Sequence, residues 1–209
     1  MAQKTRDKIL EKALQLFNEI GYMEVGVREI ARQLEMSPGN LSYHFRKKED
    51  ILFSLLNQFS EHNDQAYIAY QSSPPSNEQF LILMSRIFEH QYNYRGVYIG
   101  NQFVQAEIRK KDRFDYATIA KKRETSFKMI FEGLHAAEQV SITEEDISFL
   151  VSYITLFGRF WISEATLFSK SPDKAQIINH YLLLLSRQLL FFASSKGKKS
   201  INDFHRQFL

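Results

Sequence analysis

Residues 27–52, VREIARQLEMSPGNLSYHFRKKEDIL, carry the pattern of two short helices joined by a tight turn and followed by the start of a third helix. In the first helix Ile30 and Leu34 share one face at helical spacing. Gly26 is expected to be its N-cap, and Glu29 is expected to reach back to the Gly26 amide as half of a capping box. The stretch therefore predicts a helix-turn-helix.

The second helix of the pair is predicted to begin at Pro38, with Ser37 as its N-cap. Proline is favoured at the first helical position because the N–H that it lacks would have no partner there. Leu41 and Phe45, four residues apart, form the predicted buried face. The residues that point away from it are small or form hydrogen bonds: Gly39, Asn40, Ser42, Tyr43 and His44.

An outward helix face of this kind, with basic residues around it, suits the major groove of DNA, which admits one α-helix. Gly39 and Asn40, with Ser42 as a further candidate, are predicted to read base edges. The full set of predicted DNA-binding residues is Arg28, Ser37, Gly39, Asn40, Ser42, Tyr43, His44 and Lys48. The alternative is that two amphipathic helices present solvated outer faces and bind no nucleic acid.

Residues 5–52 resemble the DNA-binding domain of TetR-type (TetR/AcrR) bacterial transcriptional regulators. The resemblance rests on the segments TRDKILEKALQLFNEIGY, VREIARQLEMSPGNLSYHF and KKEDIL, and covers about a quarter of the chain. It implies an all-α fold with an N-terminal three-helix helix-turn-helix head and a C-terminal helical body for ligand binding and dimerisation. The implied function is that of a sequence-specific DNA-binding regulator, with a repressor released by a small molecule as the expected form.

Three positions depart from the usual pattern of these regulators. Gly26 stands in place of a threonine, Glu35 in place of a glycine in the turn, and Ser42 in place of a tyrosine. Since the first and third replacements remove hydroxyl groups that often contact phosphates, backbone contacts are expected to rest on Tyr43, His44 and Lys48. Glu35 is expected to adopt a left-handed backbone conformation, which is uncommon outside glycine.

Composition limits the class of protein. The 209 residues include no cysteine, so disulfides and thiolate metal sites are excluded within this sequence. The first twelve residues contain no apolar signal core, and charges interrupt the most apolar stretches, 147–168 and 181–193. A cytoplasmic protein without a membrane partner is therefore expected. The formal net charge is only +3, and positive charge gathers locally at residues 46–48.

Three regions are predicted: a DNA-binding domain at 1–48, an effector-binding and dimerisation domain at 49–195, and a basic tail at 196–209. A helix from about residue 47 to 71 is expected to link the first two regions, either as a lever or as a plain linker. Thr5 is the predicted N-cap of the first helix, and Gly21 is predicted to end that helix as a C′ glycine. Thr143 to Asp146 is predicted to start a later helix as a capping box, and Ser171-Pro172 is the predicted break before the last one. The tail is expected to be loosely ordered, although Ile201, Phe204 and Phe208 offer a means of docking it.

Two helices of the body, at about 143–169 and 173–194, are apolar nearly all round. Such helices must be buried on nearly all sides, so one side is expected to face a partner. The resemblance implies that they pair with their copies in a homodimer, which would bind a near-palindromic operator. The predicted interface residues are Tyr153, Phe157, Phe160, Leu182, Leu185 and Leu189. The alternative is an unusually well-buried monomer core.

Aromatic residues are dense in the rest of the body, and the resemblance would place their helices around a cavity. Effector pockets are mostly apolar with a few polar anchors. The predicted effector residues are Phe88, His90, Tyr92, Tyr98, Phe103, Phe127, Phe131, Arg159 and Trp161. An unknown hydrophobic or aromatic effector is therefore expected, and the alternative is that these side chains are ordinary core.

No residues are predicted to be catalytic, and no metal or cofactor is expected. The six histidines show no His-Glu-x-x-His spacing, and the sequence contains neither a glycine-rich phosphate loop nor a nucleophile elbow. The chain is therefore not expected to be an enzyme. The alternative function from another class is an adaptor, in which the same fold binds a protein partner and binds DNA weakly or not at all.

Overall fold

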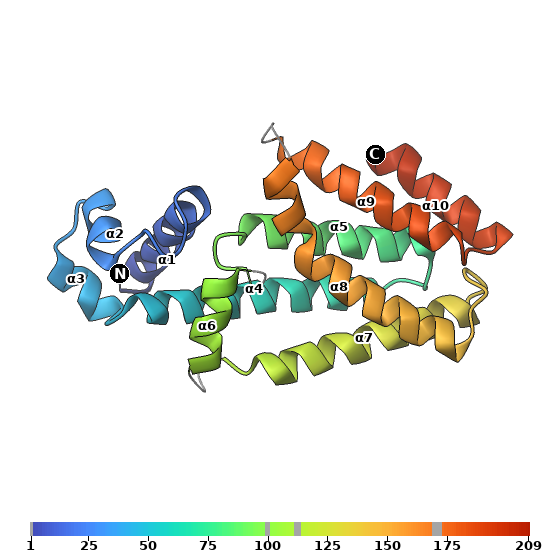
Figure 1. Ribbon diagram of the computed structural model, residues 1–209, viewed down its shortest axis with the longest axis horizontal. Coiled ribbons are helices and arrows are strands. Elements are labelled where there is room, and N and C mark those ends of the chain that lie inside the picture. The colour runs from blue at the N-terminus through green and yellow to red at the C-terminus, as the bar shows by residue number, and fades with distance from the viewer. Residues whose placement is uncertain (1, 99–100, 111–113, 169–172) are drawn as a thin grey trace. The chain divides into compact units, whose positions relative to one another are not determined.

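A computed structural model describes residues 2–98, 101–110, 114–168 and 173–209, and within these ranges the chain forms ten helices (Figure 1). Their bounds are α1 Ala2–Glu19, α2 Val27–Gln33, α3 Pro38–His44, α4 Lys48–Gln71, α5 Asn77–Asn93, α6 Gln102–Lys110, α7 Tyr116–Ala136, α8 Glu144–Phe168, α9 Lys174–Leu190 and α10 Ser195–Phe208. The predicted all-α fold is confirmed. The predicted break at Ser171-Pro172 lies outside the described residues.

The helices group into two compact units. The first unit contains Met1–His62 together with Gln91–Asp115, and the second contains Asn63–His90 together with Tyr116–Leu209. Helices α4 and α5 therefore each contribute residues to both units. The unit that holds the head is larger than the predicted domain at 1–48, because α6 and the turn before it belong to it.

The helix ends confirm several local predictions. Ser37 caps α3, since its Oγ accepts the Asn40 N–H at 3.1 Å. Thr143 and Asp146 form a reciprocal capping box before α8, with the Thr143 N–H donating at 2.8 Å and the Asp146 N–H at 3.2 Å. Gly21 follows α1 with φ of 111°, a left-handed conformation that glycine adopts without strain.

Two capping predictions are wrong. Thr5 is not an N-cap, because α1 already begins at Ala2. Glu29 does not reach back to Gly26, which has no side-chain cap. Its carboxylate instead binds Arg32 at 2.6 Å, one turn further along α2, and accepts the Gln33 side-chain amide at 3.0 Å. A charged donor on the next turn competes better for a carboxylate than a backbone amide does.

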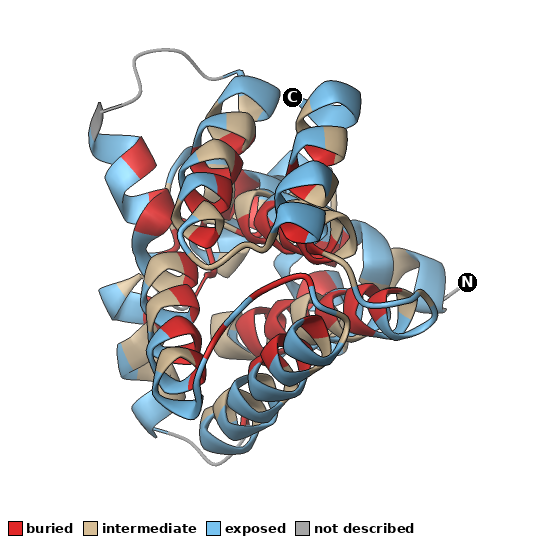
Figure 2. Cartoon of the chain, turned by 90° about the vertical axis from the view of Figure 1, so that its right-hand side faces the viewer, coloured by how far each residue is buried: buried red, intermediate tan, exposed pale blue. Residues whose placement is uncertain are grey.

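Each unit has an apolar core, and Figure 2 shows stripes of buried residues that alternate with exposed ones along the helices. In the first unit the largest fully buried side chains include Phe17 of α1 and Phe45 at the end of α3. In the second unit they include Phe88 of α5, Phe131 of α7 and Phe204 of α10. Among the described residues, no helix combines the length and the apolar character that crossing a bilayer would require.

The last segment is an ordered helix, so the prediction of a loosely ordered tail is wrong. Ile201 and Phe204 of α10 are fully buried, as the alternative of docking predicted, whereas Phe208 is 44% exposed. The start of α10 is also tied down, because Ser194 Oγ donates to the Glu138 carbonyl at 2.6 Å and Lys196 Nζ to the Ala137 carbonyl at 2.9 Å. The segment is rich in basic residues, but its apolar residues recur at helical spacing on one face of α10.

Gly197 is essential to this docking. A Cβ at Gly197 would overlap the Gln139 carbonyl oxygen and come within 2.6 Å of Asn77 Nδ2. Neither atom can move freely, because the Gln139 carbonyl accepts the Ser194 N–H at 3.1 Å and the Asn77 side chain at 3.3 Å.

We therefore predict that Gly197→Ala lowers the free energy of unfolding by about 2 kcal/mol, the usual range for a side chain forced into a packed site. Urea denaturation followed by circular dichroism measures the change. Gly133→Ala in α7 is the matched control, since its Cβ would meet only ordinary contacts at 3.6 Å and would favour the helix. Equal midpoints for the wild type and Gly197→Ala would contradict the prediction.

Candidate nucleic-acid interface

Helices α2 and α3 form a helix-turn-helix whose turn is held by backbone hydrogen bonds. The Met36 N–H donates to the Ala31 carbonyl at 3.0 Å, and the Glu35 N–H to the Arg32 carbonyl at 3.1 Å. Glu35 has φ of 53°, so the predicted left-handed position is confirmed. The turn keeps the glycine-type conformation although a glutamate occupies it.

Helix α3 has one buried side and one solvent side. Leu41 is 1% exposed and Phe45 2% exposed, so both anchor the helix in the head. The predicted base-reading and phosphate-binding residues of α3 lie on the other side, and those that are exposed are Gly39, Asn40, Ser42 and Tyr43. Tyr43 is 81% exposed, and its ring meets the half-buried His44 ring edge-on at 5.2 Å.

Gly39 has no steric role within its own chain. A Cβ at this position would meet nothing closer than Ser37 Oγ at 4.0 Å. The residue also has no positive φ among the described backbone angles. Alanine would favour the helix over glycine, so no contact among the described residues requires a glycine at this position.

Basic residues around α3 differ in what they contact. Arg28, Arg46 and Lys47 are exposed. Arg32 is also exposed, but its guanidinium is paired with Glu29. Hydrogen bonds from Arg32 and then Gln33 lower the pKa of Glu29 to about 2, so this pair stays ionised at neutral pH.

Lys48, a predicted phosphate contact, has its ammonium inside the head. Its Nζ donates to the Tyr22 carbonyl at 2.8 Å and lies 4.4 Å from the centre of the Tyr22 ring. Burial lowers the pKa of Lys48, and the charge of Glu49 partly offsets that effect. In this position Lys48 joins the start of α4 to the turn between α1 and α2.

Sequence reasoning missed Arg6 of α1, which contacts the residue at the end of α3 and a residue of α4. Its guanidinium carbon lies 4.2 Å above the Phe45 ring, and its NH2 group donates to Ser54 Oγ at 2.8 Å. The Ser54 hydroxyl in turn donates to the Asp50 carbonyl at 2.8 Å. These partners are far apart in the sequence, so no local pattern signals the contact.

The predicted effector residues are divided between the two units. Tyr92, Tyr98 and Phe103 belong to the first unit, and Phe103 is 45% exposed. The members in the second unit are Phe88, His90, Phe127, Phe131, Arg159 and Trp161.

Within the second unit the aromatic members pack on one another and on neighbouring rings. The Phe88 and Trp161 rings are 4.9 Å apart, and Phe131 lies 5.5 Å from Phe80. The two polar members have partners in the protein. His90 Nδ1 lies 3.2 Å from Asn63 Oδ1, and Arg159 donates to the Tyr116 hydroxyl at 2.9 Å.

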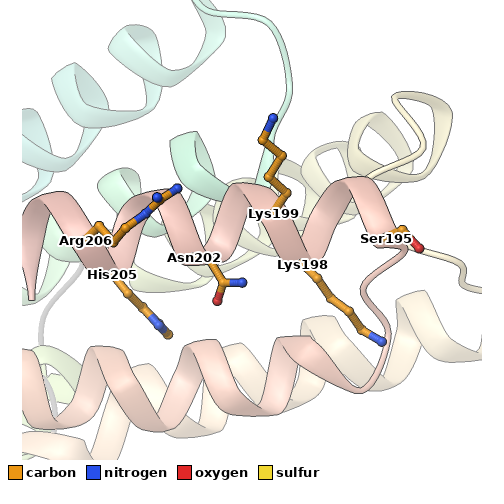
Figure 3. Close-up of a pocket in the computed structure, with 6 residues that line it drawn as sticks. All are labelled: Ser195, Lys198, Lys199, Asn202, His205 and Arg206. Carbon is orange, nitrogen blue, oxygen red and sulfur yellow. The ribbon is translucent and has the colours of Figure 1, made fainter.

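Two surface hollows of the second unit lie away from these aromatic residues. One, between α7 and α8, includes Thr125 and Val151. The other follows α10 and is lined by Ser195, Lys198, Lys199, Asn202, His205 and Arg206 (Figure 3). In Figure 3, Lys198, Asn202 and His205 extend from one side of α10 and Lys199 and Arg206 from the other, so the side chains do not converge on one point.

The predicted dimer residues also differ in burial. Leu182, Leu185 and Leu189 are at most 2% exposed, so they fill the core of their own chain and offer no area to a partner. This corrects the predicted interface. Tyr153 and Phe157 are half-buried and stack at 5.7 Å, whereas Phe160 is 45% exposed.

Other apolar side chains of α8 and α9 do reach the surface. They are Phe149, Leu156, Leu167 and Leu184, together with Phe191 directly after α9, with exposed fractions from 40% to 89%. The sequence did not indicate that these side chains are exposed, because both helices are apolar on nearly all sides and periodicity does not distinguish the side that faces the core.

Comparison with known proteins agrees with this architecture. The family model described as "Bacterial regulatory proteins, tetR family" matches residues 9–55. A second family model, described as "Bacterial transcriptional repressor", matches residues 58–190. Both are descriptions of regulators and neither is of an enzyme, in agreement with the prediction.

Curated relatives match over parts of the chain. The probable HTH-type transcriptional regulator YttP of Bacillus subtilis is 32% identical over 111 residues, which are 52% of this chain and 52% of that protein. The regulator QacR of Staphylococcus aureus is 44% identical over 52 residues, 25% of this chain and 28% of that protein. The matches thus span about half or less of these relatives.

A crystal structure of a TetR-family regulator from Marinobacter aquaeolei VT8 covers 98% of both chains with a TM-score of 0.84 at 21% identity, which supports the fold alone. The repressor description, by contrast, is a sequence match that extends over more than half of the chain. The chain therefore belongs to the TetR family of bacterial helix-turn-helix transcriptional regulators.

Proposed function

We propose that this protein is a homodimeric repressor that binds a near-palindromic DNA operator through α3 and is released by a small hydrophobic or aromatic effector. The observation that carries the proposal is the division of α3 into an anchored side and a solvent side. Leu41 and Phe45 are buried, while Gly39, Asn40, Ser42 and Tyr43 face solvent.

The solvent side of α3 has the chemistry for reading a major groove. The Asn40 side chain carries both a donor and an acceptor, the pair that recognises an adenine edge. Gly39 leaves room for the groove wall, because nothing fills the space beside it. Arg28, Arg46 and Lys47 are exposed and supply positive charge for phosphates.

The exposed apolar side chains of α8 and α9 support a dimer. Leu156 and Phe160 of α8, four residues apart on one face of the helix, are 61% and 45% exposed, and exposed apolar side chains that lie together mark interaction sites. A twofold axis makes such a patch contact its own copy. Two recognition helices are then expected to meet half-sites about one DNA turn, ~34–36 Å, apart or somewhat more.

The effector is proposed to enter the aromatic part of the second unit, around Phe88, Phe131 and Trp161. These rings are at most 2% exposed and are held by contacts with other rings. A molecule with apolar or aromatic character would replace such contacts with similar ones. A ligand that binds one arrangement of the body better than another shifts the population toward it, and so changes operator affinity.

Selection of duplexes from a random pool by the full chain tests the proposal. We expect an enriched near-palindromic site, and Asn40→Ala should change the preference at one base pair in each half-site, with a loss of ~1–3 kcal/mol for the wild-type base. Glu11→Ala, an exposed change on α1, is the control. Failure to enrich any sequence would favour the adaptor alternative, in which a protein partner takes the place of DNA.

Lys47 and Lys48 are predicted to differ in the salt dependence of operator binding. Lys47→Ala should lower the slope of log K against log salt by about one unit, because an exposed phosphate contact is lost. Lys48→Ala should leave the slope unchanged and reduce thermal stability, because its ammonium binds the Tyr22 carbonyl. Fluorescence anisotropy at several salt concentrations measures both, and a lower slope for Lys48→Ala would return that residue to the phosphate contacts.

Leu156→Glu is predicted to separate the dimer. A charge placed at this exposed position would be buried without a partner in the interface, which is strongly unfavourable. Met129→Glu on α7 is the matched control, since Met129 is also 61% exposed. Light scattering at micromolar concentration should give a monomer for Leu156→Glu and a dimer for the wild type and Met129→Glu. A monomeric wild type would refute the proposed assembly.

A further inference from the structure

Asn18 joins the end of α1 to the turn between α5 and α6. Its Oδ1 accepts the N–H of Gly96 at 2.7 Å, and its Nδ2 donates to the Asn93 carbonyl at 2.7 Å. One amide side chain thus satisfies a donor and an acceptor of a backbone segment more than 70 residues away. An amide provides both functions at once, whereas a carboxylate provides only acceptors.

Gly96 allows this contact because it has no side chain. A Cβ at Gly96 would overlap the carbonyl group of Phe17 and lie 2.6 Å from the amide nitrogen of Asn18. Gly96 does not have a positive φ, so the requirement is for space and not for a special backbone angle. The backbone of the turn therefore lies directly against the backbone of α1.

Helix α6 follows this turn and reaches the same part of the head. Val97 and Val104 are fully buried. Tyr22, which meets Phe17 edge-on at 5.2 Å, is 2% exposed. Burial raises the pKa of Tyr22, and the nearby negative charges of Glu107 and Glu49 raise it further. A carboxylate of α6 thus lies within electrostatic reach of the turn that leads into α2.

The division of the chain into two compact units also places the turn and α6 with α1. Gln91–Asp115 belongs to the compact unit that contains α1, α2 and α3, although the chain passes through Asn63–His90 of the other unit in between. A head of three helices, two of them with only seven residues, has little core of its own, because small domains bury too small a fraction of their surface. The turn and α6 add buried surface at the end of α1.

We propose, on the basis of the operator binding proposed above, that Asn18 is a positioning residue for that binding. By fixing the turn between α5 and α6 to the end of α1, Asn18 makes α6 part of the DNA-binding unit and holds α1 where α2 and α3 pack on it. Asn18 itself touches no base or phosphate in this role.

The test compares Asn18→Ala, Asn18→Asp and Glu19→Ala in the full chain. Asn18→Ala should weaken binding to the selected operator about tenfold, the effect expected for two lost hydrogen bonds, at an unchanged salt slope. The Gly96 amide should exchange with deuterium at least about tenfold faster by NMR. Asn18→Asp keeps the acceptor, so it should restore Gly96 protection and part of the affinity. Glu19→Ala, an exposed neighbour, should change neither.

Gly96→Ala provides a second route to the same contact, since it pushes the turn away while Asn18 remains. It should weaken operator binding to a similar degree. The double variant Asn18→Ala/Gly96→Ala should bind the operator as strongly as either single variant, because both changes break the same contact. All variants are compared under conditions in which circular dichroism shows that they are folded. If Asn18→Ala does not fold, the operator affinity and the Gly96 exchange rate of Asn18→Asp serve as the test.

Two results would overturn the inference. Fully additive losses in the double variant would show that Asn18 and Gly96 act separately. Faster exchange at Gly96 with unchanged operator affinity would show that the contact is structural only. If no duplex is selected at all, the proposed DNA binding fails, while Gly96 exchange still decides whether Asn18 holds the turn.

Discussion

The burial of Leu41 and Phe45 determines which side of α3 faces outward. A seven-residue helix has too few internal hydrogen bonds to be stable alone, so its orientation depends on these anchors. One residue turns a helix by about 100°, and a shift in the anchors would therefore present a different set of side chains. Arg6 of α1 packs on the Phe45 ring and so helps to hold Phe45 in the core. The outward position of Asn40 follows from this packing.

Features that depend on three or four adjacent residues were predictable from the sequence. Ser37 and Thr143 cap their helices as expected, and Glu35 adopts the left-handed turn conformation. Each depends on a local geometry that has few alternatives. The Gly26 and Glu29 prediction failed for an equally local reason, since Arg32 competes for the same carboxylate. A pattern match does not rank the partners that one side chain can reach.

Features that depend on distant packing were not predictable. Leu185 and Leu184 are adjacent leucines of α9, yet Leu185 is 2% exposed and Leu184 40% exposed. When every side of a helix is apolar, its sequence does not show which side its own chain covers. For the same reason the sequence did not show the contact between Lys48 and the Tyr22 carbonyl, 26 residues away, when Lys48 was predicted to contact phosphate. Contacts between residues distant in the sequence determine which charged groups stay unpaired and which apolar side chains stay exposed.

Charge around α3 is partly used inside the head, and this bears on how the proposed complex gains specificity. Arg32 is paired with Glu29, and Lys48 holds the turn after α1, so neither adds a free charge to the rim. Exposed cations such as Arg28, Arg46 and Lys47 remain. Because each phosphate contact strengthens binding to every sequence alike, a head with few free cations binds non-specific DNA weakly. In the proposed complex, its preference for one operator then comes from base contacts on α3 and from two heads acting together. Such a head needs an accurately held recognition helix more than it needs additional charge, and the internal use of Lys48 and Arg6 serves that requirement.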